Sequence, residues 1–340
     1  MTETETETGT ETSRPEARRR RVLPKILIAV AVIIVAALAA GVIYAFQIDR
    51  SLTKNLTRSD SLPDDTPTAS GQSPRPTKDP RAQGTLNYVL LGADQNPDES
   101  AGRSDSIMIV HLNAKRDKAY IISFPRDMYV QIPGYGRNKI NAAFAFGGPK
   151  LAVATLENLT GDRMDHVALV DFDGFIELTD DLGGVTVYNK TAFSSRGYTF
   201  PKGDITIKGE QALVYVRERK QLPRGDFDRA ENQRNVIKAI VQKGLSPKVI
   251  SNPVTFLNFI TGVAKHLTVD SQLGDGEIRD TALSLRLSPS NIQLLQAPVT
   301  GTGTQDGQSI DIVDAVRMKE LGNAMRTDQL EAYVKKYPAG

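Results

Sequence analysis

One uncharged apolar run, residues 26–46, most constrains how this chain can fold. As a helix it would extend about 32 Å, which matches the hydrocarbon core of a bilayer. The apolar region of a cleaved signal peptide is shorter, about 7 to 15 residues, so we expect an uncleaved membrane helix. A basic block precedes the run directly and consists of Arg14, Arg18, Arg19, Arg20, Arg21 and Lys25. By the positive-inside rule, the N-terminus should lie in the cytoplasm and the residues after Gln47 outside.

The segments on either side of this run have the composition of an unfolded chain. Residues 1–25 combine a Thr/Glu-rich tract with the basic block, so we expect a disordered basic cytoplasmic tail. Residues 47–83 are rich in Ser, Thr, Pro and Asp, and their prolines interrupt any periodic pattern. They are therefore predicted to form a flexible extracytoplasmic linker. The folded domain should then occupy residues 84–340.

The composition excludes several kinds of chemistry. The chain contains no cysteine, which excludes disulfides, thiolate metal sites and cysteine nucleophiles. Its three histidines are far apart in the sequence, and no Walker-type phosphate loop, HExxH pair or GxSxG turn occurs. The formal net charge of +2 gives no reason to expect a nucleic-acid partner. Oxygen and nitrogen groups must therefore form any site.

Short apolar runs of strand length alternate with helical segments in the folded domain. The first three runs are predicted strands, and the brief polar turn at 113–117 makes the second and third antiparallel neighbours. Strands mixed with helices indicate a layered α/β domain. The predicted strands are 86–91, 106–112, 119–124, 166–170 and 292–296, and the predicted helices include 139–146, 149–159, 172–182 and a terminal one at 328–337.

Charged residues gather where the first three strands should meet. In an up-down-up meander, the end of the first strand, the start of the second and the end of the third lie at one sheet edge. These corners carry Asp94, Arg103 with Asp105, and Arg126 with Asp127. Carboxylates and guanidiniums together suit a hard cation that shares an anionic oxygen ligand with the arginines. Salt bridges on a solvated rim are the alternative interpretation.

A second basic group lies between Leu213 and Arg234 and includes Arg217 and Arg219. A helix that begins near Asp226 would place Arg229 and Gln233 on the side that continues as Ile237, Ile240 and Val241. An arginine that points inward needs a protein carboxylate or an anionic ligand, because an unpaired buried charge is costly. For Asp226, a helix N-cap is an equally good interpretation. Just after the predicted turn at 133–136, Lys139 could reach an anion and Asn141 is expected to cap a helix.

In their order and spacing, five segments between Asn87 and about Lys243 identify the chain as similar to the catalytic domain of the LytR-CpsA-Psr (LCP) family. This resemblance implies an α-β-α layered sandwich with a central mixed sheet, preceded by one N-terminal transmembrane helix. It also implies a pyrophosphate site over an apolar tunnel for a polyprenyl chain. The segments are LLGADQ, GRSDSIMIVHL, SFPRDMYVQIPGYGRNKINAAFAFGG, VDFDGFIELTDDLGGVTVY and KGEQALVYVRERKQLPRGDFDRAENQR.

The resemblance also implies a role for each of the charged residues. Asp94 and Asp105 would hold Mg²⁺ or Mn²⁺. Asp226 would be the candidate base, and Arg103 and Arg126 would complete the catalytic group. The residues expected to bind the pyrophosphate are Arg103, Arg126, Arg217, Arg219 and Arg229, supported by Gln233.

By the same resemblance, the protein would be a phosphotransferase at the cell membrane of a Gram-positive type of envelope. It would move a polyprenyl-pyrophosphate-linked glycopolymer, of teichoic acid, arabinogalactan or capsule type, to a muramic-acid hydroxyl of peptidoglycan and release polyprenyl phosphate. Three alternatives stay open: a membrane-tethered transcriptional regulator, a polyprenyl-pyrophosphate hydrolase that uses the same site, and a wall-binding module without catalytic activity.

Overall fold

The computed structural model describes residues 47, 50–65, 74–93 and 104–338. The chain divides into two compact units, Met1–Gln47 and Ile48–Gly340, and every described residue except Gln47 belongs to the second. The expected cytoplasmic tail, 1–25, and the expected membrane helix, 26–46, both lie outside the described residues. Within the described ranges, no helix is both long and apolar enough to cross a membrane.

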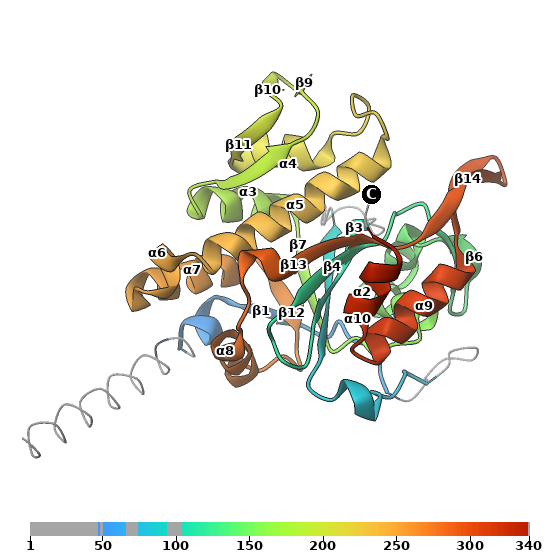
Figure 1. Cartoon of the computed structure of the whole chain (residues 1–340), viewed down its shortest axis with the longest axis horizontal. Helices are drawn as coiled ribbons and strands as arrows, with labels where there is room; N and C mark the ends of the chain where they lie inside the picture. Colours follow the sequence, from blue (N-terminus) through green and yellow to red (C-terminus); the bar gives the residue numbers. More distant parts are fainter. Residues whose placement is uncertain (1–46, 48–49, 66–73, 94–103, 339–340) are drawn as a thin grey trace, which may run out of the picture. The chain divides into compact units, whose positions relative to one another are not determined.

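A seven-stranded mixed sheet lies at the centre of the second unit (Figure 1). The strands β2, β3 and β4 form the expected antiparallel meander, while β7 pairs parallel to β2 and β13 parallel to β4. The predicted α/β fold with a mixed sheet is therefore confirmed. In spatial order the strands are β1 (Thr57–Ser59), β12 (Thr268–Asp270), β7 (His166–Val170), β2 (Leu86–Ala93), β3 (Ser104–Leu112), β4 (Ala119–Ser123) and β13 (Ile292–Gln296).

Helices cover both faces of this sheet because its central strands are apolar on both sides. Successive side chains of a strand point to opposite faces. Ile107 and Ile109 of β3 therefore pack in one core with α2 (Asn141–Thr160), α9 (Ala315–Arg326) and α10 (Leu330–Lys336). Met108, between them, packs in a second core against α5 (Asp226–Gly244). The layered arrangement expected from the sequence follows directly from this alternation.

A third core lies on the other side of α5 and gives that helix partners on two sides. Val236 and Ile240 of α5 belong to this core, whereas Ile237 packs in the core next to the sheet. The elements around the third core are α3 (Phe172–Asp181), α4 (Gly209–Arg217) and the hairpins β8 (Val185–Asn189) with β11 (Gly203–Ile207) and β9 (Phe193–Ser195) with β10 (Tyr198–Phe200). Further helices are α6 (Pro247–Ile250), α7 (Pro253–Ala264), α8 (Asp275–Ser284), η2 (Pro80–Ala82) and η3 (Pro289–Asn291).

The element α2 contains a sharp break in its middle. Gly147 and Gly148 have non-helical backbone angles, with φ of −151° and 63°, and Pro149 follows them. Only glycine adopts the second of these conformations readily. The predicted break between the helices 139–146 and 149–159 is therefore confirmed. The first one begins later than expected, because Lys139 ends the strand β6 (Gly136–Lys139).

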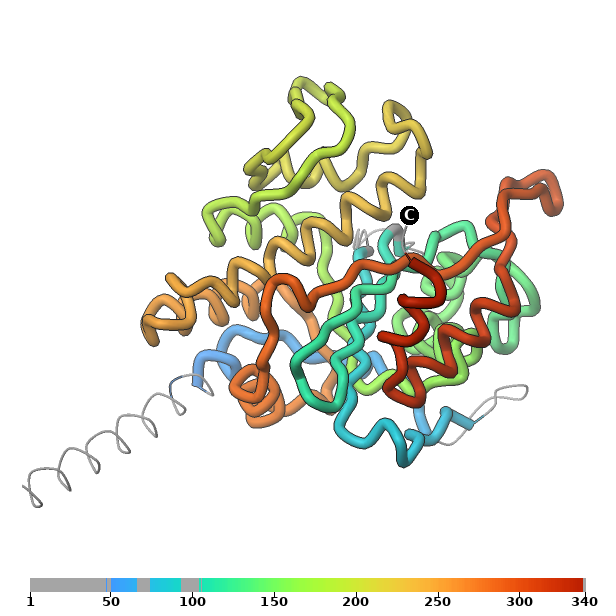
Figure 2. Tube along the Cα trace, in the orientation of Figure 1, coloured from blue at the N-terminus to red at the C-terminus, as the bar shows by residue number. Residues whose placement is uncertain are grey.

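Two hairpins lie next to each other at one side of the sheet. The first is β5 (Tyr129–Ile132) with β6, joined through the predicted turn at 133–136. The second, β14 (Val299–Gln305) with β15 (Gln308–Val313), was not predicted, and it projects from the rest of the unit in Figure 2. A bridge between Met128 and Asp311 connects them.

The expectation of a flexible linker over residues 47–83 is wrong for the part that the structure describes. The strand β1 joins the sheet beside β12, and Leu52, Leu62 and Ala82 are buried. Local composition did not reveal this packing because the partners of these residues are distant in sequence.

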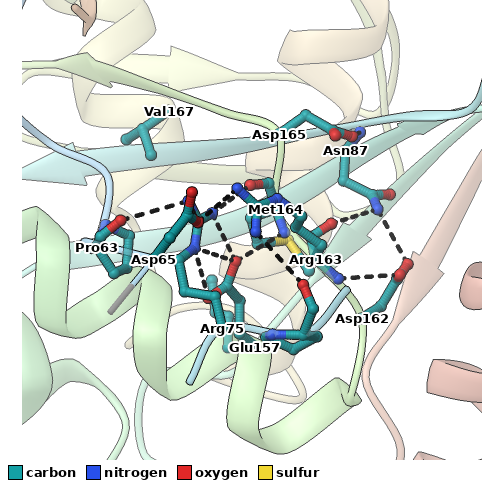
Figure 3. Close-up of polar contacts among 12 residues, drawn as sticks. Pro63, Asp65, Arg75, Asn87, Glu157, Asp162, Arg163, Met164, Asp165 and Val167 are labelled. Atoms are coloured by element: carbon teal, nitrogen blue, oxygen red, sulfur yellow. Dashed lines mark hydrogen bonds and ion pairs between the residues drawn. The ribbon is translucent and has the colours of Figure 1, made fainter. Parts of the chain in front are cut away.

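A buried ion pair holds the second half of this segment, as Figure 3 shows. The guanidinium of Arg75 donates from Nη2 to Glu157 Oε1 at 2.7 Å and to the carbonyl of Met164 at 2.7 Å. The side chains of Arg75 and Glu157 are only 4% and 3% exposed. The backbone N–H of Met164 donates to the same carboxylate, which fixes Glu157 at the end of α2.

We predict that Arg75→Ala destabilises the protein by about 3–5 kcal/mol, because it leaves the Glu157 carboxylate buried without its cation. Urea unfolding followed by circular dichroism measures the change. Arg81→Ala is the matched control, since Arg81 is exposed and pairs with Asp79 in the same segment. Equal stability of the two variants would contradict a structural role for the Arg75 pair.

Candidate active site

Four strand ends meet at one edge of the sheet. Ala93 at the end of β2 pairs with Ser104 at the start of β3, and Ser123 at the end of β4 pairs with Met108. Val170, at the end of β7, lies beside Gly92. The expected convergence of the three corners at one edge is therefore confirmed for the backbone.

The described residues include only part of the predicted charged set at this edge. Asp94 and Arg103 lie outside them, and Asp105 belongs to β3 but its side chain lies outside the description. Arg126 and Asp127 follow β4 and are described in full. Among the three corners, the one after β4 has both of its charged side chains within the described residues.

Asp226 connects this corner to the N-terminus of α5. Its Oδ1 atom lies 2.7 Å from Arg229 Nη2 and 3.5 Å from Arg126 Nε. The N-cap of α5 is Gly225, whose φ of 54° favours glycine, and no side chain caps this helix. The N-cap interpretation of Asp226 is therefore wrong, and its carboxylate serves as the partner that the inward-facing Arg229 requires.

Two further ion pairs extend this group from Arg126 to Asp127 and Lys139. Arg126 Nε lies 3.8 Å from Asp127 Oδ2, and Asp127 Oδ1 lies 2.9 Å from Lys139 Nζ. Side-chain exposure is 7% for Arg229 and between 19% and 24% for the other four residues. We call this series, Arg229–Asp226–Arg126–Asp127–Lys139, the ion-pair chain. Its alternating charges hold three segments of the protein together.

A cavity of about 700 Å³ adjoins the ion-pair chain. Its walls are mainly apolar and come from β2, β3, β7, α3, α4 and α5, and we call it the apolar cavity. The expected stripe of α5 lies along it, so the orientation predicted for that helix is confirmed. From α5 the lining residues are Arg229, Gln233, Val236, Ile237, Ile240 and Val241.

The end of α4 and the loop after it bring two further arginines to this cavity. Arg217 and Arg219 both line it and are exposed, which marks the side on which it opens. The guanidinium carbon of Arg217 lies 4.3 Å from the ring centre of Phe172, a cation–π contact with the start of α3. Gln233 Nε2 donates to the carbonyl of Val216 at 3.3 Å, which supports the end of α4 next to Arg217.

Glu218 shapes the loop between these two arginines, a role that the sequence did not indicate. Its Oε1 atom accepts hydrogen bonds from the backbone N–H groups of Arg219, Lys220 and Gln221. Burial alone would raise the pKa of Glu218, but bonds from the Ser195 side chain and these N–H groups hold it below its ordinary value. Glu218 is therefore ionised when it fixes this loop.

Asp311 is a third carboxylate beside the ion-pair chain, and it too was missed. Its backbone N–H donates to the carbonyl of Asp127 at 2.8 Å, and the residue is 6% exposed. Burial and the negative charges of Asp127 and Asp226 raise its pKa to about 6, and Lys139 opposes this rise only in part. Within the described residues, no cation pairs with its carboxylate.

Together these features define an α/β protein with a site for an amphiphilic anion. The apolar cavity suits a long hydrocarbon part, and the arginines at its opening suit phosphate oxygens.

The chain belongs to the LytR-CpsA-Psr family, because the profile of the LytR_cpsA_psr family matches residues 51–327. It is 32% identical over 309 residues to the polyisoprenyl-teichoic acid–peptidoglycan teichoic acid transferase TagU of Bacillus mycoides (strain KBAB4), covering 89% of this chain and 97% of that one. A TagU of Enterococcus faecalis is 37% identical over 250 residues, with 71% and 80% covered.

Solved structures resemble the fold over most of the chain. The crystal structure of B. subtilis TagV matches with a TM-score of 0.64 and 25% identity, covering 72% of this chain and 98% of that one. A structure of TagT bound to LI-WTA matches with a TM-score of 0.59 and 26% identity, covering 80% and 99%. These similarities agree with the family assigned from the sequence.

We predict that Asp311→Asn stabilises the fold at neutral pH. Because burial raises the pKa of Asp311, the native state keeps this proton at pH values where the unfolded chain has lost it. In the parent protein, the Asp311 carboxyl group therefore contributes to the free energy of unfolding at acid pH, and this contribution is lost as the pH rises through about 6. At about pH 8 the free energy of unfolding should increase by on the order of 1–3 kcal/mol, and near pH 4 the difference should vanish.

Chemical denaturation at several pH values, in the presence of a chelator, measures this difference. Asp306→Asn is the control, because Asp306 is exposed in the turn of the same hairpin. The two proteins are compared by their free energies of unfolding. If the difference between Asp311→Asn and the parent does not change with pH, the prediction of a raised pKa for Asp311 is wrong.

Proposed function

We propose that this protein is a phosphotransferase that joins a polyprenyl-pyrophosphate-linked glycopolymer to a muramic-acid hydroxyl of peptidoglycan and releases polyprenyl phosphate. One observation carries the proposal: a single cavity of about 700 Å³ has apolar walls for a lipid and arginines for its anionic head. The names of the TagU relatives and the TagT structure bound to LI-WTA support a glycopolymer of the teichoic acid type.

In the proposed reaction, the oxygen of the muramic-acid hydroxyl attacks the phosphorus atom that carries the glycopolymer. The bond from this phosphorus to the bridging oxygen breaks, and polyprenyl phosphate leaves. Such reactions depend mainly on positioning and on neutralising negative charge. Arg126, Arg217, Arg219 and Arg229 would bind the phosphates, with Arg103 as a further candidate. Asp226, held between two arginines, is the candidate acceptor of the hydroxyl proton.

Asp94 and Asp105 are the proposed ligands of Mg²⁺ or Mn²⁺. Carboxylates are suitable ligands for such hard cations. Ala93, which precedes Asp94 in the chain, pairs with Ser104, which precedes Asp105. This pairing of their neighbours fits the proposed donor set. A bound metal would supply positive charge toward the phosphate oxygens. Among the described residues, there is no group of three or more acidic or histidine side chains that could hold a metal.

The proposed location is the outer side of the cell membrane. The basic block followed by the apolar run 26–46 supports a single anchor with a cytoplasmic N-terminus. A polyprenyl-linked donor is itself a membrane lipid, and peptidoglycan lies outside the membrane, so an anchored domain on that side reaches both proposed partners. The proposal does not require a nucleic acid.

Incubation of the protein with a labelled lipid-linked donor and a peptidoglycan fragment tests the reaction. We expect the label to become attached to the muropeptide, which mass spectrometry would identify. Release of free phosphorylated glycan, with or without the fragment, would indicate the hydrolase alternative instead. Retention of polymer without any product would indicate a wall-binding module, and salt-sensitive DNA binding without turnover would indicate a regulator.

We predict that Arg217→Ala and Arg219→Ala each lower transition-state stabilisation by about 2–4 kcal/mol, because each removes a cation from the phosphate site. Single-turnover transfer rates measure the loss. Arg286→Ala is the control, since Arg286 is exposed and lies beside Arg116 at the opposite end of β3 and β4. Transfer at the parent's rate by both site variants would remove these arginines from the mechanism.

A further inference from the structure

A second cavity, of about 330 Å³, lies beside the apolar cavity and differs from it in chemistry. We call it the polar cleft. The β5–β6 hairpin, the first turns of α2 and the tip of β15 form it. Its polar lining includes Arg126, Asp127, Asn138, Lys139 and Asn141. Its volume falls at the lower end of the range of small-molecule sites, roughly 300–1,000 Å³.

Arg126 lines both cavities. The ion-pair chain passes from one to the other, because Arg229 lines the apolar cavity whereas Asp127 and Lys139 line the polar cleft. Asp226 is not a lining residue of either cavity, but it pairs with Arg126, which lines both, and with Arg229. A molecule in the polar cleft would therefore approach the phosphate site from the side away from the lipid.

Asn141 provides an open hydrogen-bonding group inside this cleft. The residue is only 6% exposed, and none of the described residues forms a hydrogen bond with its side-chain amide. The expected capping role is wrong, because Ile140 occupies the N-cap position and no side chain caps α2. The amide atoms of Asn141 are not among the fully buried side-chain atoms that lack a partner, so they are accessible from the cleft, where a ligand or water can form hydrogen bonds with them.

An exposed pair of stacked aromatic rings borders the same cleft. The rings of Tyr135 and Phe146 stack with their centres 4.9 Å apart and an angle of 20° between them. The two residues are nevertheless 55% and 41% exposed, and Phe146 lines the cleft. An exposed pair of large aromatic residues beside polar groups is typical of a binding surface.

We propose that the polar cleft binds the glycan strand of the acceptor peptidoglycan. This inference rests on the proposed transferase function and adds where the acceptor lies. A sugar ring has an apolar face for Tyr135 and Phe146 and has hydroxyl and acetamido groups for Asn138 and Asn141. With its strand in the cleft, a muramic-acid hydroxyl would face Arg126 and Asp226, opposite the lipid-linked phosphate in the apolar cavity.

Binding of an undecorated peptidoglycan oligosaccharide to the full chain in detergent tests this directly. We expect Tyr135→Ala and Phe146→Ala each to raise the Kd about tenfold, through the lost aromatic contact. Asn141→Ala should weaken binding as well. Tyr188→Ala is the matched control, because Tyr188 is 53% exposed but lies on β8, away from the cleft. Parent affinity in both aromatic variants would overturn the proposal.

A second measurement separates this proposal from the proposed reaction and from misfolding. Binding of geranylgeranyl pyrophosphate, a probe of the apolar cavity, should be unchanged in Tyr135→Ala and Phe146→Ala. In transfer assays these variants should raise the KM for the acceptor and leave the KM for the donor unchanged. If the parent transfers nothing, the proposed function fails, whereas the oligosaccharide Kd values still decide whether the cleft binds a glycan strand.

Discussion

The position of Asp226 between Arg126 and Arg229 is the interaction on which the rest of the site depends. Arg229 points into the protein from α5 and is almost fully buried, so its charge requires an anion within the fold. Asp226 supplies that anion and, through Arg126, connects the start of α5 to the end of β4. The helix whose apolar stripe lines the cavity is thereby held at the sheet edge where the charged residues gather.

Features that depend on local periodicity were predicted well from the sequence. The length and β-branched content of the apolar runs, with the short polar turn at 113–117, predicted the meander of β2, β3 and β4, and the order of those strands placed their charged corners at one edge. The period of α5 placed Arg229 and Gln233 on the side of Ile237, which the cavity lining confirms. In each case the deciding contacts lie within one element or between neighbours in the chain.

Features that depend on distant partners were not predictable in this way. The segment around Arg75 resembles a linker in composition, and contacts with distant residues such as Glu157, 82 residues away, and Met164 make it part of the fold. Asp311 lies between two isoleucines in an ordinary alternating strand, and its importance arises from a backbone bond to Asp127. Asn141 is of a residue type that often caps helices. However, Ile140 takes the N-cap position of α2, and Asn141 lines the polar cleft.

The ion-pair chain also bears on how a charged ligand would be recruited. Within the described residues, its three cations are balanced by Asp226, Asp127 and the neighbouring Asp311, so this inner group carries little net charge when Asp311 is ionised. Arg217 and Arg219, exposed at the opening and without a carboxylate partner in the described part of the chain, keep their full charge. Long-range attraction of an anion from solution would then come from these two outer arginines, while the inner residues discriminate by shape and hydrogen bonding.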